Sequence, residues 1–122
     1  MDILLNVNQN HQKIHLSPGG YYILIVGGYY IEEHSFSVSL IDVRSNEKIS
    51  VKRAKRLWTT SIGFGKRAKY FYYIDVENAG EYAVNFSNPQ SLVVYRYLLW
   101  IYRMLSSPVD NSLIEIAIRK NG

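Results

Sequence analysis

The residues best suited to chemistry in this sequence lie between positions 52 and 73, where cations stand close to aromatic rings. The tetrapeptide KRAK occurs at 52–55 and again at 66–69. The segment 52–69 contains seven Lys and Arg and no acid, whereas the other seven basic residues face ten acidic ones. The net charge of +4 therefore comes from one local patch. Such a patch attracts phosphate and carboxylate groups.

We expect this patch to lie on a hairpin formed by residues 56–62 and 69–76, with its turn at the GFGK segment between them. If Ile62 pairs with Arg67, charged and aromatic side chains share one face, because side chains alternate along a strand. That face then carries Arg56, Trp58, Thr60, Arg67, Lys69, Phe71 and Tyr73. Burying unpaired cations would be costly, so we expect this face to be exposed and the opposite face to join the core.

Cations bind phosphate or carboxylate, and aromatic faces stack on bases or sugars. The combination predicts a non-enzymatic binding module whose basic-aromatic strand face, about 52–73, contacts an anionic partner: a nucleic acid, an acidic glycan or an acidic protein. The expected ligand-binding residues are Arg56, Trp58, Lys66, Arg67, Lys69, Phe71 and Tyr73. The second KRAK copy has no acid near it in sequence, so its cations are the first choice for mutation.

The same pattern has a second interpretation, in which this strand face is only solvated. Lysine on an exposed strand discourages edge-to-edge aggregation, and cross-strand aromatic pairs stabilise a sheet without any ligand. A register shift of one residue would also exchange the faces of one strand. The prediction of a binding face therefore depends on the register of the hairpin.

Nothing in the sequence predicts a defined reaction. The chain has no cysteine and no G-x-S-x-G motif, and its carboxylate pairs at 32–33 and at 75 and 77 have no other group to support catalysis. His11 and His15 would share a strand face, but Lys13 lies between them. A third ligand would have to come from Glu32, Glu33 or His34 through strand pairing, and surface histidines are the simpler interpretation. We therefore expect no enzyme, no cofactor and no metal site. An enzyme of unknown class is the third hypothesis.

Two apolar segments support an alternative function. YYILIV at 21–26 and LVVYRYLLWIYRML at 92–105 offer more two-sided apolar surface than a small domain readily buries. Exposed apolar surface of this kind is typical of subunit interfaces. The alternative is a structural or assembly subunit that forms a homo-oligomer through these segments. Otherwise the first segment is a central strand with a helix covering it.

Alternation of apolar and polar residues predicts the fold. It marks strands at 35–43, 81–86 and 113–120, and the high tyrosine content favours strands elsewhere. Together with frequent turn signals, the pattern predicts about eight to ten short strands and at most one short helix, near 98–105. We expect one all-β domain over 1–122, an antiparallel β-sandwich of jelly-roll type, with a barrel as second choice.

The sequence also gives expectations about location. The N-terminal stretch has no basic region and only a short apolar run, which does not fit a signal peptide. The segment 92–105 is too short for a membrane-spanning helix and carries Arg96 and Arg103. We expect a cytoplasmic protein without a transmembrane segment.

Overall fold

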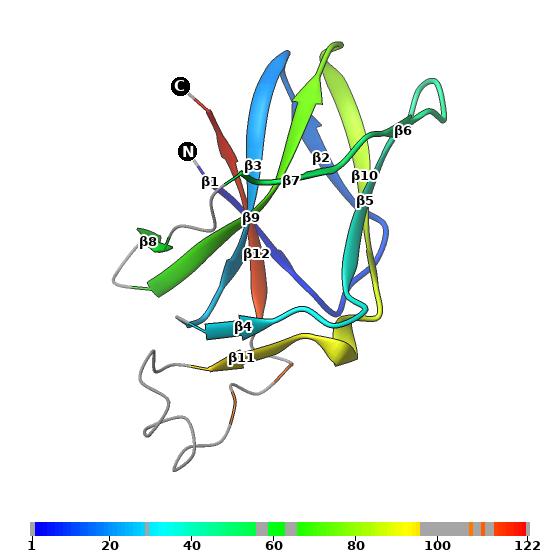
Figure 1. Cartoon of the computed structure of the whole chain (residues 1–122). Coiled ribbons are helices and arrows are strands. Elements are labelled where there is room, and N and C mark those ends of the chain that lie inside the picture. The colour runs from blue at the N-terminus through cyan, green and yellow to red at the C-terminus, as the bar shows by residue number, and fades with distance from the viewer. Residues whose placement is uncertain are drawn as a thin grey trace.

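The computed structural model describes residues 2–28, 30–55, 59–62, 66–95, 108, 111 and 114–121 (Figure 1). Within these residues the chain forms strands and one short 3-10 helix at Pro89–Ser91, with no α-helix. Every strand pair in this part of the chain is antiparallel. The prediction of an all-β chain with antiparallel sheets is confirmed.

The strands belong to two main sheets and one small one. The larger sheet has the order β1 (Asp2–Asn6), β12 (Glu115–Lys120), β3 (Gly19–Val26), β9 (Lys66–Val76) and β7 (Lys52–Arg53), and β8 (Thr59–Ile62) also pairs with β9. The second sheet has the order β2 (Gln12–Leu16), β10 (Gly80–Ser87), β5 (Ser37–Asp42) and β6 (Lys48–Ile49). The small sheet pairs β4 (Tyr30–Glu32) with β11 (Val93–Tyr95).

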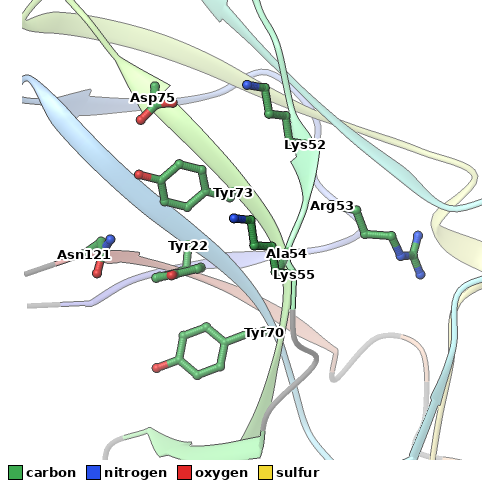
Figure 2. A pocket seen from close by; sticks show the side chains of 9 residues that line it. All are labelled: Tyr22, Lys52, Arg53, Ala54, Lys55, Tyr70, Tyr73, Asp75 and Asn121. Atoms are coloured by element: carbon green, nitrogen blue, oxygen red, sulfur yellow. The ribbon is translucent and has the colours of Figure 1, made fainter.

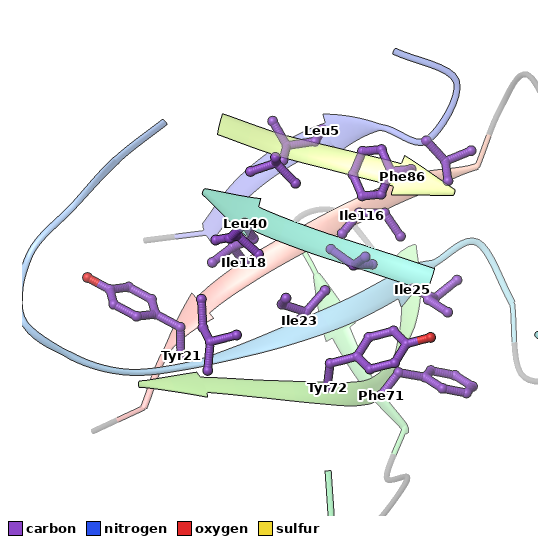
Figure 3. Close-up of a cluster of buried hydrophobic side chains, with 14 of the residues drawn as sticks. Leu5, Tyr21, Ile23, Ile25, Leu40, Phe71, Tyr72, Phe86, Ile116 and Ile118 are labelled. Carbon is purple, nitrogen blue, oxygen red and sulfur yellow. The ribbon is translucent and has the colours of Figure 1, made fainter. Parts of the chain in front are cut away.

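One large core lies between the two main sheets, and Figure 3 shows side chains from both meeting there. The predicted alternation positions these side chains: Val38 and Leu40 on β5 are buried, as are Tyr82, Val84 and Phe86 on β10. On β12, Ile116 and Ile118 face this core as expected. Alternating apolar residues bury one face of each strand and thus hold the sheets together.

The strand β3 is the most buried of the larger sheet. Ile23 and Ile25 join the main core, while Leu24 and Val26 form a second buried cluster on the other face, with Ala68 and Ala117. Leu24 is 0% and Val26 2% exposed. The segment is thus a central strand that is buried on both faces, while the helix expected to cover it is not among the described residues. Segment 21–26 offers no exposed aliphatic surface, which counts against it as an assembly interface.

A β-bulge in β9 changes which side chains face the core. Ile23 pairs with Tyr72, but the next residue of β3, Leu24, pairs with Tyr70, so Phe71 is the extra residue. A bulge interrupts the strict alternation of a strand. Phe71 and Tyr72 both join the main core, whereas Tyr70 packs on the second cluster, on the outer face.

Some expectations differ from the structure or lie outside it. The described residues contain twelve strands rather than eight to ten, because strands of two or three residues were not expected. The sheets do not close into a barrel. The helix expected near 98–105, like most of segment 92–105, lies outside the described residues. A jelly-roll sandwich remains a prediction.

No helix in the described part of the chain is long and apolar enough to span a membrane. The cytoplasmic location remains a prediction.

Candidate functional site

The hairpin of β8 and β9 has a register that differs by one residue from the predicted one. Ile62 pairs with Lys66 instead of Arg67, and Thr60 pairs with Ala68 instead of Lys69. β9 begins at Lys66, three residues before the expected strand at 69–76 and one residue before the expected partner of Ile62. Arg56 and Trp58, two of the predicted ligand-binding residues, lie outside the described residues.

Phe71 does not lie on an exposed face. It is 2% exposed and belongs to the main core. The guanidinium of Arg53 lies over its ring, 6.0 Å from the centroid, and is ion-paired with Glu33. The Tyr72 hydroxyl donates a hydrogen bond of 2.6 Å to the same carboxylate, and burial raises the pKa of this tyrosine although Arg53 opposes the shift. Phe71 is therefore part of a packed structural group.

The cations of the second KRAK copy have different surroundings from one another. The Lys66 ammonium donates a hydrogen bond of 2.8 Å to Glu115 on β12, a partner 49 residues away in sequence. Arg67 is exposed and Lys69 is half-buried. Lys66 is thus partly neutralised by an acid that its sequence neighbours did not reveal. The predicted site residues do not form one continuous exposed face.

The most distinctive concave feature lies on the outer face of the larger sheet. It is a pocket of about 720 Å³ formed by β3, β9, β7 and the residue after β12. It is lined by three tyrosines, three basic residues, one carboxylate, one amide and one alanine: Tyr22, Tyr70, Tyr73, Lys52, Arg53, Lys55, Asp75, Asn121 and Ala54. We call it the tyrosine–lysine pocket. Figure 2 shows Lys52 and Lys55 on the pocket side of β7, while the neighbouring Arg53 points away.

The three tyrosines form one cluster because β3 and β9 pair directly. Tyr22 lies opposite Tyr73 in the register. Its ring makes edge-to-face contacts with Tyr70, at 5.1 Å between centroids, and with Tyr73, at 5.2 Å. Arg119 Nη1 donates a hydrogen bond of 3.1 Å to the Tyr70 hydroxyl. All three rings are half-buried, so each keeps part of its surface open to solvent.

The position of Tyr73 requires a glycine on the neighbouring strand. A Cβ atom built on Gly20 would overlap the Tyr73 hydroxyl and lie 2.8 Å from its ring carbon Cζ. The ring therefore lies across the bare backbone of β3. The GGYY motif at 19–22 thus provides both the space for Tyr73 and the ring of Tyr22 that contacts it.

The Tyr73 hydroxyl is hydrogen-bonded to polar groups in the pocket. Its hydrogen bond to Asp75 raises the pKa of Tyr73, and partial burial and the charge of Asp75 act in the same direction, while Asn121 opposes them. The phenol therefore stays protonated at neutral pH. Next to the tyrosines the pocket offers two ammonium groups, one carboxylate and one amide, which suit a ring-shaped ligand with hydroxyls and one negative charge.

Among the predicted ligand-binding residues that the structure describes, only Tyr73 lines this pocket. Sequence reasoning missed Tyr22, Tyr70, Lys52, Lys55 and Asn121 as binding residues. Lys52 and Lys55 belong to the first KRAK copy, and Tyr22 belongs to the first GGYY copy. These two repeated motifs were the sequence features that could have pointed to the pocket residues. From the sequence, Asp75 is a candidate catalytic carboxylate or an acid that neutralises part of the first KRAK copy, and not a binding residue.

Two further observations concern metal binding and known proteins. The described residues contain no group of three or more His, Asp or Glu that could hold a metal ion. No family model, curated protein or solved structure matches this chain. Its function must therefore be inferred from the pocket itself.

Proposed function

We propose that this chain is a non-enzymatic binding module that holds an acidic glycan in the tyrosine–lysine pocket. The observation that carries the proposal is the cluster of Tyr22, Tyr70 and Tyr73 beside Lys52 and Lys55 in one cavity. Half-exposed rings offer apolar faces to the C–H groups of a sugar, and ammonium groups pair with its carboxylate. This retains the anionic partner predicted from the sequence but assigns it to a different set of residues.

The shape of the pocket favours a sugar over a nucleic acid. Its volume of about 720 Å³ is typical of small-ligand sites, which span roughly 300–1,000 Å³. Proteins that bind single-stranded nucleic acid instead use a long basic groove along the backbone.

The charge of the pocket favours the same ligand. Asp75 lies in it beside the two lysines and would repel a phosphodiester chain, whereas its carboxylate accepts hydrogen bonds from sugar hydroxyls. An acidic protein partner would also be expected to prefer a broader surface.

We also infer that the two main sheets form a jelly-roll sandwich. The strand orders β1-β12-β3-β9 and β2-β10-β5-β6 support this inference. Along the chain, successive strands of these eight alternate between the sheets at every step except β5 to β6. An eight-stranded jelly roll has this kind of nested arrangement, and lectin domains are among the proteins that use it. Fold analogy alone identifies no ligand, so the proposal depends on the pocket.

The direct test is to measure the affinity for short uronic-acid oligosaccharides by calorimetry, with single-stranded DNA of equal charge for comparison. We expect the oligosaccharide to bind more tightly. The double variant Lys52→Gln/Lys55→Gln should lower its affinity about tenfold or more, because charge-assisted hydrogen bonds contribute roughly 1.5–3 kcal/mol. Lys13→Gln is the matched control, since this exposed lysine lies on β2, away from the pocket. Absence of oligosaccharide binding, or equal loss with the control, would disprove the proposal.

A further inference from the structure

A second cavity adjoins the tyrosine–lysine pocket. It has a volume of about 360 Å³ and shares three lining residues with the pocket: Lys52, Tyr73 and Asp75. Its other walls come from the β5–β6 connection and from the segment between β9 and β10. Because these side chains line both cavities, the cavities are direct neighbours, and we call the pair the groove. A ligand longer than the first pocket would reach the second cavity.

The second cavity differs chemically from the first. Its lining adds Asp42, Glu47 and Glu77 to the shared Asp75, so four carboxylates face Lys48 and Lys52. Its second tyrosine, Tyr82, is only 2% exposed and offers no open ring face. A unit bound here would therefore be recognised by hydrogen bonds to carboxylates rather than by stacking, and a further negative charge would be repelled.

Asp42 makes part of this wall rigid. It is 8% exposed and is the one charged residue in the described chain that is buried. Its carboxylate Oδ1 accepts a hydrogen bond of 2.9 Å from the backbone N–H of Arg44. Its own backbone N–H donates a hydrogen bond of 2.8 Å to the backbone carbonyl of Glu47. The pKa of Tyr82 is raised by burial and, next, by the charge of Asp42. The turn thus holds a carboxylate at a defined position in the cavity wall.

From this groove we propose that the ligand is at least a disaccharide, with its acidic unit in the tyrosine–lysine pocket and a neutral or amino sugar in the second cavity. The proposal rests on the proposed function and specifies its ligand as an unsulfated alternating glycan of uronic acid and hexosamine. Sulfate on the hexosamine would place a second anion among the carboxylates. The groove therefore selects against sulfated chains.

Three probes test this arrangement by calorimetry: glucuronic acid alone, an unsulfated glucuronic acid–hexosamine disaccharide, and the same disaccharide with sulfate on the hexosamine. We expect the unsulfated disaccharide to bind about tenfold or more tightly than the monosaccharide, since each added hydrogen-bonded unit contributes to affinity. We expect the sulfated disaccharide to bind no better than the monosaccharide.

A charge-removing variant provides an independent measurement. Glu47→Gln/Glu77→Gln changes two exposed carboxylates of the second cavity that lie outside the tyrosine–lysine pocket. It should increase the affinity for the sulfated disaccharide and leave that for glucuronic acid unchanged. Glu81→Gln is the control, because this exposed acid lies on β10 opposite His15 and lines neither cavity.

The outcomes separate the two proposals. If none of the three probes binds, the proposed function itself fails. If glucuronic acid and both disaccharides bind with equal affinity, the first pocket binds sugar but the second cavity does not, and this inference is wrong. The inference is also wrong if the Glu47→Gln/Glu77→Gln variant binds the sulfated disaccharide with the same affinity as the unmutated protein.

Discussion

At the scale of single residues, the candidate site depends on Gly20 and Tyr73. The Tyr73 ring occupies the space where any other residue at position 20 would have its Cβ atom. The ring also contacts Tyr22 and is hydrogen-bonded to Asp75. A change at Gly20 would therefore displace one wall of the tyrosine–lysine pocket without touching a ligand.

We expect Gly20→Ala to lower the affinity for uronic-acid oligosaccharides about tenfold, a loss of roughly 1.4 kcal/mol, because the Tyr73 ring must move. Calorimetry with the single variants Gly20→Ala and Tyr73→Ala and with the double variant measures this coupling. In the Tyr73→Ala background, Gly20→Ala should add little. Strictly additive losses would show that the two residues act independently.

Lys66 was among the residues chosen from the sequence as a ligand-binding cation, but it is ion-paired with Glu115 and lies outside the pocket. We expect Lys66→Gln to leave oligosaccharide affinity unchanged within about twofold and to lower the free energy of unfolding by at most ~1 kcal/mol, as for other exposed ion pairs. Binding titrations and urea unfolding check both values. An affinity loss as large as that of Lys52→Gln/Lys55→Gln would contradict our assignment.

Among the structural elements, β9 contains a bulge that decides which aromatic residues face the core and which face the tyrosine–lysine pocket. It adds Phe71 to the buried side, so Tyr70 lies on the outer face beside Tyr22. The alternation expected for an uninterrupted strand assigned Phe71 to the exposed face and Tyr70 to the core. Both assignments are wrong for the same reason, one extra residue in the strand.

Phe71→Ala should therefore affect stability rather than binding. Removing a buried phenylalanine side chain costs about 3–5 kcal/mol, and chemical unfolding followed by circular dichroism would measure this loss. Phe71→Leu keeps most of the apolar volume and should be milder, while oligosaccharide affinity stays near that of the unmutated protein. A normal unfolding free energy with weakened binding in Phe71→Ala would indicate that Phe71 is a ligand contact after all.

At the scale of the whole molecule, two sheets are held together by a core that includes tyrosine hydroxyls. Burial raises the pKa of both Tyr72 and Tyr82 above the ordinary value of 10.0. Tyr72 donates to Glu33 and Tyr82 donates to the carbonyl of Asn78 at 2.5 Å. Both phenols thus hold their protons more tightly in the folded chain than in the unfolded chain.

This difference predicts a loss of stability in alkali. Below the ordinary tyrosine pKa both states keep the protons and stability is unaffected, whereas above it the unfolded chain releases protons more readily, so the free energy of unfolding falls as pH rises. Urea unfolding at about pH 8, 9, 10 and 11 measures the slope. Tyr82→Phe should reduce the fall above pH 10. An unchanged slope in this variant would contradict the contribution of Tyr82.

Local sequence pattern was sufficient to predict the all-β class and the buried residues of several strands. Strict alternation on β5, β10 and β12 identified buried residues correctly, because the pleat sends successive side chains to opposite faces whatever the partner strand is. It also showed that cations lie close to aromatic rings between 52 and 73. These features are local, and local pattern is sufficient to predict them.

Only the tertiary structure decided which of those residues meet. A hairpin register one residue from the expected one changed the pairing of β8 with β9, and the bulge exchanged the two faces of β9 before Tyr72 but not after it. The pairing of β3 with β9 brought Tyr22 to Tyr73, and the pairing of β7 with β9 placed Lys52 opposite Tyr73. Register depends on contacts between strands distant in sequence, and a shift of one residue reverses every side chain. For this reason the sequence indicated which types of residue the candidate site contains, but not which individual residues form it.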